Sequence, residues 1–211
     1  MGSKILNFFK RLSVTQKVIL CILAFWVTGY IFCLPRHLFH VPYSTVVTDR
    51  NEELLGARIA SDGQWRFPPR NTTPEKIKEC LITFEDKHFY HHWGVNPFAI
   101  GRAFYQNVKN KRIVSGGSTL TMQVIRLSRQ KPRTIRLARN ESRTFREKLI
   151  EMIWATRLEF RASKEEILSM YISHAPFGGN VVGLDAAAWR YFGHSADDLS
   201  WAESAMLAVL P

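Results

Sequence analysis

Glu85 and Asp86 head the first group of residues whose types and spacing could do chemistry. They open the pattern EDxxFxxHxG at 85–94. Glu85 follows Leu81 by one helical turn, at the edge of an apolar stripe, where partial removal from water helps a carboxylate to accept a proton. That position predicts a general base. The alternative is that both acids face solvent near a helix end.

The histidines of this segment have a spacing that occurs in metal sites. His88, His91 and His92 stand at i, i+3 and i+4. No ligand of another type lies nearby, so we expect surface or packing residues rather than a metal centre.

The second group is the segment SGGST at 115–119, which runs directly into the helical sequence LTMQVIRL. Paired glycines let backbone N–H groups converge, and the helix start adds positive potential, so the segment could cradle phosphates. It lacks the Gly-Lys-Ser/Thr ending of a Walker A loop. The alternative is an ordinary loop at the start of a helix.

The third group belongs to a basic tract at 109–148, which contains twelve Lys and Arg residues and two acidic ones. A solvated or membrane-proximal surface is the default interpretation. At the end of the tract, Lys148 is followed by Glu151 at i, i+3, and the small Ala155 on the same helical face leaves room for a ligand. The alternative is an ordinary ion pair worth a few tenths of a kcal/mol.

Helices must position these residues, and the domain is predicted to be mainly α. Thr73 before Pro74 signals a helix start, after which apolar residues recur at i, i+3, i+4 and i+7. Ser163 and Glu166 form a capping box for a later helix. The turn-rich residues at 41–70 predict a hairpin or an extended linker. The apolar stripe comprises Ile77, Cys80, Leu81 and Phe84, and further helices are predicted at 97–109, 119–128, 143–160, 164–172, 183–192 and 200–209.

The N-terminal part of the chain predicts a membrane anchor. Residues 18–34 carry no charge and reach about the minimum length that spans hydrocarbon. Four basic residues precede this run, so the positive-inside rule places the N-terminus in the cytoplasm. A cleaved signal peptide is the alternative, but the run is longer than usual and no Ala-x-Ala site follows it. The predicted segments are a cytoplasmic basic tail at 1–17, a transmembrane anchor at 18–35, an extracytoplasmic linker or hairpin at 36–70 and one domain at 71–211.

Composition narrows the classes of function. Of the 211 residues, 46% are hydrophobic and 12% aromatic, which excludes a disordered chain. The net charge of +11 calls for nucleic acid, anionic lipid or a phosphorylated substrate. We expect no nucleic acid, because the domain is predicted to face outward and no zinc-finger or RNP-like pattern occurs. The three cysteines predict neither a disulfide framework nor a zinc site, since two of them lie in the apolar run.

Five blocks in a fixed order resemble the peptidoglycan glycosyltransferase domain of class A penicillin-binding proteins and monofunctional transglycosylases. The resemblance runs from about residue 46 to residue 211. Within the family, GVNPF at 94–98 and APFGG at 175–179 are most similar to the penicillin-binding protein 1C type. The blocks are EDKHFYHHWG at 85–94, GGSTLTMQ at 116–123, KLIEMIWATRLE at 148–159, the segment 164–193 and LSWAESAMLAVLP at 199–211.

The resemblance implies a lysozyme-like helical glycosyltransferase domain that polymerises lipid II into glycan strands. Glu85 would be the general base that takes a proton from the acceptor hydroxyl, which attacks the anomeric carbon with inversion and releases undecaprenyl pyrophosphate. Glu151 would be the second catalytic carboxylate, orienting cations or a divalent metal ion such as Mg²⁺ or Mn²⁺. Arg126, Arg143 and Lys148 would bind the substrate at the pyrophosphate. Ser118, Thr119 and Gln123 would line the donor side, while Asp86 and Phe89 would shape the site around Glu85.

The resemblance also implies a setting. The protein would be a single-pass protein of the bacterial inner membrane with a periplasmic catalytic domain, and it would bind lipid II, the growing strand and proteins of a cell-wall synthesis complex. Family members commonly have Arg-Lys where this chain has Glu147-Lys148. They also continue beyond the position of Pro211, so we expect 71–211 to lack the C-terminal end of the domain. The alternatives are a non-catalytic scaffold in such a complex and a lysozyme-like muramidase.

Overall fold

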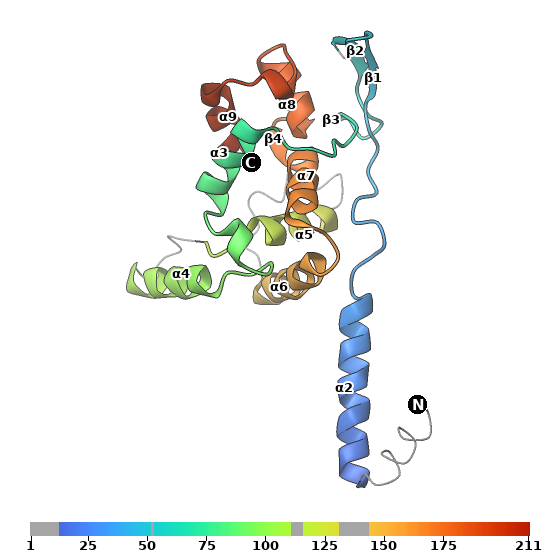
Figure 1. The fold of residues 1–211 in the computed structure, drawn as a ribbon, viewed down its shortest axis with the longest axis vertical. Helices are drawn as coiled ribbons and strands as arrows, with labels where there is room; N and C mark the ends of the chain where they lie inside the picture. The colour runs from blue at the N-terminus through green and yellow to red at the C-terminus, as the bar shows by residue number, and fades with distance from the viewer. Residues whose placement is uncertain (1–12, 52, 111–115, 131–143) are drawn as a thin grey trace. The chain divides into compact units, whose positions relative to one another are not determined.

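The computed structural model describes residues 13–51, 53–110, 116–130 and 144–211. These residues form eight α-helices, α2 to α9, together with two 3-10 helices and five short strands. The chain divides into two compact units, Met1–Arg36 and His37–Pro211. The prediction of a mainly α protein is confirmed (Figure 1).

The first unit contains the helix α2, Val14–Phe32. Ser13 caps it and forms a capping box with Gln16, so the helix begins in a polar turn just before the uncharged run. None of its residues is buried. By length and composition α2 could cross a membrane, which agrees with the predicted N-terminal apolar helix.

The second unit begins with strands. β1 (Thr45–Thr48) pairs antiparallel with β2 (Leu54–Arg58), which forms the predicted hairpin. A separate three-stranded sheet has the order β3-β5-β4. Its members are β3 (Trp65–Arg66), β4 (Pro176–Gly178) and β5 (Val181–Val182), with β3 parallel and β4 antiparallel to β5.

A buried arginine ties the hairpin region to the rest of this unit. Arg66 is only 2% exposed. Its guanidinium donates to the Pro42 carbonyl at 2.7 Å and to the Asp62 carboxylate at 2.9 Å, and its backbone N–H donates to the Ser44 hydroxyl at 3.0 Å. A buried cation needs such partners, because an unpaired one would carry a large desolvation cost.

The remaining helices agree with the predicted ranges to within about two residues at each described end. Thr119 caps α5, and Ser163 and Glu166 form the predicted capping box of α7. The elements are α3 (Glu75–Glu85), η1 (Phe89–His91), α4 (Pro97–Asn110), α5 (Leu120–Arg129), α6 (Phe145–Glu159), α7 (Lys164–His174), α8 (Leu184–Tyr191), η2 (Ala196–Asp198) and α9 (Trp201–Ala208).

α3 begins at Glu75, directly after the predicted start signal, with Pro74 as its N-cap and without a side-chain capping bond. One detail of its apolar stripe was predicted wrongly. Of the predicted stripe, Ile77 and Leu81 are fully buried, but Phe84 is 60% exposed. The stripe is therefore buried over the first two turns only, and within the described residues the Phe84 side chain in the last turn stays largely exposed.

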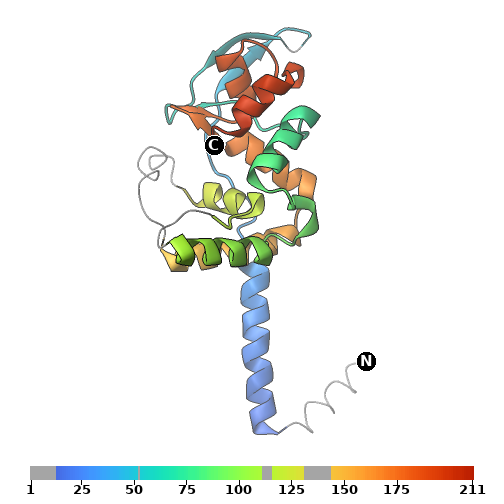
Figure 2. The same ribbon diagram turned by 90° about the vertical axis from the view of Figure 1, so that its left-hand side faces the viewer.

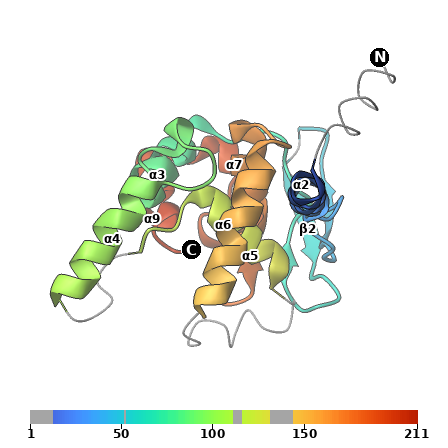
Figure 3. The same cartoon turned by 90° about the horizontal axis from the view of Figure 1, so that it is seen from below.

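The core is organised around α5 and α7. α5 packs against both α6 and α7, while α3 packs against α9. Figure 3 shows α5, α6 and α7 side by side. Every residue of α5 from Leu120 to Ile125 is buried, so this helix presents side chains to neighbours on all sides.

α4 and α6 lie at the same end of the domain, away from the hairpin (Figures 1 and 2). Both helices expose large apolar side chains. We call the surface that these side chains form the α4–α6 surface. Phe98 is 88% exposed and Phe145 is 80% exposed. The surface comprises Phe98, Phe104, Tyr105 and Val108 of α4 and Phe145, Leu149 and Ile153 of α6.

Candidate active site

Glu85 is the last residue of α3, and its half-buried carboxylate is held by α5. The Gln123 side-chain amide donates to Glu85 Oε2 at 2.6 Å. The two residues are 38 positions apart in the chain, so the packing of two helices creates the contact. The hydrogen bond fixes the direction of the carboxylate and leaves part of it accessible.

Gln123 is itself held from two sides. Its amide oxygen accepts from Arg126 Nη2 at 3.3 Å and from the Tyr171 hydroxyl at 3.4 Å. Because both neighbours are donors, the amide oxygen must face them and the amide nitrogen must face Glu85. Glu85, Gln123, Arg126 and Tyr171 therefore form one connected group, which we call the open half of the site.

Tyr171 contributes a buried hydroxyl to the open half. The side chain is 1% exposed, and burial raises its pKa, with a further increase from the Glu85 charge and a partial decrease from Arg126. The hydroxyl consequently keeps its proton and serves as a donor to Gln123.

Asp86 has different surroundings from Glu85. Its Oδ2 atom accepts from the backbone N–H of Leu120, the first residue of α5, at 3.1 Å and lies 2.9 Å from His92 Nε2. Asp86 and His92 are 7% and 8% exposed. An acid at a helix N-terminus is stabilised by the helix dipole and by an N–H group that has no partner within the helix.

The loop around Gly94, which follows Asp86 in the chain, packs closely against α6. Thr119 donates to the Gly94 carbonyl at 2.6 Å and accepts from the Met122 N–H at 3.2 Å. Gly94 has a φ of +77°, and a Cβ at this position would lie 2.6 Å from the Ala155 backbone. Only glycine fits there. Asp86, His92, Gly94 and Thr119 make up what we call the closed half of the site.

Phe89 supports the closed half from within the core. Its ring is fully buried, and the Lys164 ammonium lies 4.5 Å from the ring centroid. Lys164 also donates to the His92 carbonyl at 2.7 Å and to Glu159 at 2.7 Å, and Glu159 accepts from Thr121 at 2.6 Å. The predicted substrate-binding residue Phe89 thus lies beneath the site and shapes it.

α6 carries the second predicted carboxylate. Glu151 is 4% exposed, while Lys148 is half-buried and forms no salt bridge with any acidic residue in the described part of the chain. Lys148 and Glu151 therefore do not form the ordinary i, i+3 ion pair. Glu147 has a local role, because it and Thr144 form the capping box of α6.

The glycine loop is partly described. Gly117 lies against α4, where a Cβ would come within 2.9 Å of the Ile100 backbone. Two N–H groups of the first turn of α5 are already satisfied, by Asp86 and by Thr119. Ser118 is half-buried at the loop end. The contacts of the first turn are those of a capped helix start, and Ser115 and Arg143 lie outside the described residues.

The structure thus connects Glu85 and Arg126 through Gln123, which is hydrogen-bonded to both. Tyr171 and Lys164 were not predicted as part of the site. The sequence contained one signal for Tyr171. It lies among apolar positions of a predicted core helix, and a buried hydroxyl needs a hydrogen-bond partner. Among the three histidines of the segment, His88 and His91 are exposed and His92 pairs with Asp86.

The described residues contain no group of three or more His, Cys, Asp and Glu that could hold a metal ion. The donors near the site are single carboxylates. A hard cation would fit such donors only if most of its ligands were water or substrate oxygen atoms.

The open half combines two chemical capacities. A half-buried carboxylate with a fixed direction can accept a proton from a hydroxyl group that is bound beside it. A guanidinium next to the same amide can interact with an anionic group. The fold and site therefore define a helical enzyme domain suited to acid–base chemistry beside an anion.

Comparison with known proteins identifies the family. The transglycosylase family model matches residues 52–211 of this chain. The chain belongs to this family, and the predicted resemblance is confirmed.

The similar proteins are penicillin-binding proteins. The chain is 41% identical to penicillin-binding protein 1C of Escherichia coli over 194 residues, which cover 91% of the chain and 24% of that protein. It is 34% identical to penicillin-binding protein 1A of Clostridium tetani over 80% of the chain and 20% of that protein, and 36% identical to penicillin-binding protein 1F of Bacillus subtilis over 67% and 18%. The chain thus spans about a quarter or less of the length of these relatives.

Proposed function

We propose that this protein is a peptidoglycan glycosyltransferase that polymerises lipid II into glycan strands. The observation that carries the proposal is the hydrogen bond of 2.6 Å from Gln123 that fixes the Glu85 carboxylate, with Arg126 bonded to the same Gln123 amide, within a domain of the transglycosylase family. Glu85 removes the proton from the acceptor sugar hydroxyl. The hydroxyl oxygen attacks the anomeric carbon with inversion, and undecaprenyl pyrophosphate leaves.

The leaving group sets the demands on the rest of the site. A pyrophosphate leaves as an anion, so it needs positive charge rather than a strong acid. We propose that Arg126, Lys148 and Arg143 supply this charge and that the buried Glu151 orients them. A divalent cation such as Mg²⁺ or Mn²⁺, held by a carboxylate and by pyrophosphate oxygen atoms, would supply further charge neutralisation.

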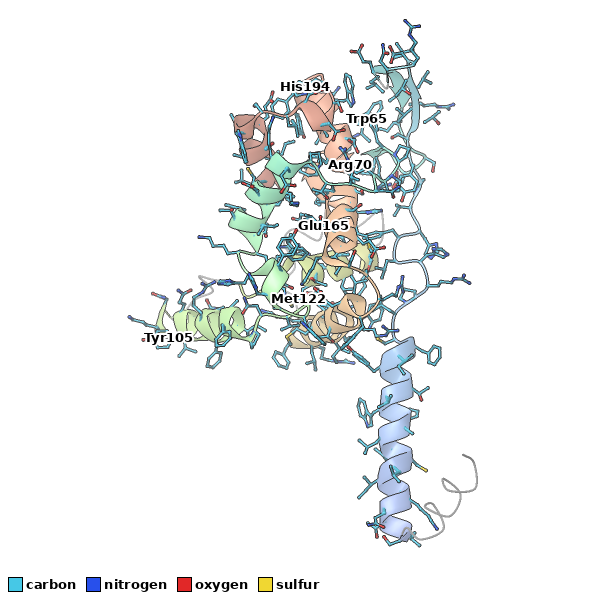
Figure 4. All side chains as sticks on the ribbon, viewed as in Figure 1. Trp65, Arg70, Tyr105, Met122, Glu165 and His194 are labelled. Carbon is cyan, nitrogen blue, oxygen red and sulfur yellow. The ribbon has the colours of Figure 1, made fainter. Side chains whose placement is uncertain are left out.

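The α4–α6 surface supports a lipid-linked substrate. Exposed apolar patches of this kind mark membrane or protein interaction sites. Tyr105 extends outward from α4 in Figure 4, like the other large apolar side chains of the surface. A domain that rests on a bilayer through this surface could take a polyprenyl-linked donor directly from the membrane.

We further propose that α2 is a single transmembrane anchor with the N-terminus in the cytoplasm and the catalytic domain in the periplasm. Reporter fusions that fold only in one compartment, placed after residue 211 and before residue 13, would test this orientation. Activity of a cytoplasmic reporter at the C-terminus would contradict it.

The direct test uses the whole chain in detergent with lipid II. We expect glycan polymer from the unmodified protein and none from Glu85→Gln. The substituted amide can still accept the Gln123 hydrogen bond, so this variant should fold normally. Glu79→Gln is the matched control, because Glu79 is an exposed acid on the same helix and should leave the rate unchanged.

Other outcomes would select an alternative. Release of soluble muropeptides from isolated sacculi without consumption of lipid II would indicate a muramidase. A scaffold in a cell-wall synthesis complex would be indicated if a double substitution of Glu85 and Glu151 preserved biological function. Absence of polymer from well-folded protein would contradict the proposal.

A further inference from the structure

A pocket lies away from the open half, at the end of the domain that carries the hairpin. It has a volume of about 210 Å³. Figure 4 shows Trp65 between the hairpin and α8. We call it the Trp65–Trp189 pocket. Its lining is apolar or aromatic except for one cation: Leu54, Ala57, Trp65, Phe67, Ala186, Trp189 and Arg190.

Well-anchored elements form this pocket. The Trp65 N–H donates to the Asn180 carbonyl at 2.8 Å, and β3 pairs in register with β5. Successive strand residues point to opposite faces, so the burial of Arg66 in the domain turns Trp65 toward the pocket. On α8, the buried Ala186 and the larger side chains of Trp189 and Arg190 all line the pocket. The pocket is therefore preformed.

The lining favours a ring-shaped ligand with a negative charge. Sugar rings present apolar C–H faces that pack on indole rings, while their hydroxyl groups stay in water at the rim. Arg190 is exposed at the pocket, and no acidic side chain belongs to its described lining. A guanidinium in such a position binds carboxylates through two parallel hydrogen bonds.

The size of the pocket restricts the ligand to one ring. A volume of about 210 Å³ is below the roughly 300–1,000 Å³ of pockets that enclose drug-sized molecules. A fatty chain would leave the guanidinium unmatched. A single sugar unit of a longer strand can insert its ring while the neighbouring units remain outside.

We propose that the Trp65–Trp189 pocket binds one sugar ring of a carboxylate-bearing glycan strand. The inference rests on the proposed function, because the disaccharide-peptide units of the product carry both the ring and the carboxylate. The pocket holds a part of the strand that lies beyond the reacting sugars, so it adds to the affinity for polymer and not to the chemical step.

The test uses the whole chain in detergent, labelled with 5-fluorotryptophan and observed by fluorine NMR. The probe is a set of soluble, uncrosslinked glycan oligomers that carry their peptides. We expect saturable shifts of the Trp65 and Trp189 resonances but not of Trp201, which is exposed on α9 outside the pocket. Arg190→Gln should weaken this binding at least fivefold, while Arg58→Gln, a change of an exposed cation on β2, should not.

Three results would overturn the inference. These are unshifted Trp65 and Trp189 resonances, equal effects of Arg190→Gln and Arg58→Gln, and tighter binding of an acidic peptide that carries no sugar. Chito-oligosaccharides without carboxylates should bind equally well to the unmodified protein and to Arg190→Gln.

Glu85→Gln separates this inference from the proposed function. That variant should lose polymerisation and keep the fluorine shifts. Polymerisation by the unmodified protein without any shifts would refute the pocket alone, and shifts without polymerisation would refute the proposed function alone.

Discussion

Glu85 and Asp86 follow one another in the chain, but their carboxylates lie in different surroundings. Glu85 is half-buried and receives one side-chain hydrogen bond, from Gln123. Asp86 is 7% exposed, and one of its oxygen atoms meets both a helix N-terminus and His92. The open half therefore keeps a reactive group accessible, and the closed half fixes the backbone around it.

The difference shows how one acidic pair serves two purposes. A carboxylate that is buried against two polar neighbours stabilises the fold but is not accessible to a substrate hydroxyl. A carboxylate that is partly exposed can still accept a proton from such a hydroxyl. We expect substitutions in the closed half to change stability and substitutions in the open half to change turnover.

The largest effect is expected from Gly94→Ala in the closed half. The new Cβ would lie 2.6 Å from the Ala155 backbone, at a φ of +77°. We expect a loss of about 3 kcal/mol or more in the free energy of unfolding, measured by denaturant titration. Gly63→Ala is the control, because its φ is +75° but nothing lies within 4 Å of the added Cβ. Equal losses in the two variants would show that the closed half is not tightly packed.

Asp86→Asn tests the charge within the closed half. The amide keeps the shape of the side chain but removes the negative charge that faces the Leu120 N–H and His92. We expect a loss of about 1–2 kcal/mol in the free energy of unfolding. A variant with unchanged stability but no turnover would assign Asp86 to the open half instead.

Gln123→Met tests the open half. The substitution keeps the length of the side chain and removes the hydrogen bond to Glu85. We expect kcat for lipid II polymerisation to fall about tenfold with little change in KM, since a hydrogen bond to a charged group is worth about 1.5 kcal/mol or more. Gln106→Met on α4 should leave kcat unchanged. A change confined to KM would contradict a role in orienting Glu85.

The free energy of unfolding is expected to depend on pH through His174, the last residue of α7. The ring stacks on Phe39, and burial lowers its pKa from 6.5 to about 4. The unfolded chain therefore binds a proton more readily than the folded one between these values, so stability is full above pH 6.5 and falls as the pH drops toward 4. The expected slope is roughly 1.4 kcal/mol per pH unit.

Substitution of His174 by Leu should remove most of this slope, whereas the same change at the exposed His88 should retain it. The measurement is the free energy of unfolding at several pH values. A slope that survives in His174→Leu would place the responsible group elsewhere.

Local sequence signals predicted most of the helical architecture. Caps and apolar periodicity depend on residues three or four positions apart, so they can be read without knowledge of the fold. Phe84 shows the limit of such patterns. It has the correct phase for burial but is 60% exposed, and periodicity contains no information about where a neighbouring helix ends.

The candidate site was predictable in part. The order of the five blocks singled out Glu85, Asp86 and Gln123, but the different surroundings of the two acids were not visible in it. Tyr171 was missed because it reaches Gln123 from 48 positions away in the chain. The Trp65–Trp189 pocket was missed for the same reason, because its two indole rings come from β3 and α8.

The sequence by itself determined the apolar N-terminal helix, the mainly helical domain and the family. These properties follow from composition, short-range periodicity and the order of motifs. Only the tertiary structure decided that Glu85 stays accessible while Asp86 is sealed. That distinction depends on which atoms of α5 meet the end of α3, and the packing of distant segments sets those contacts.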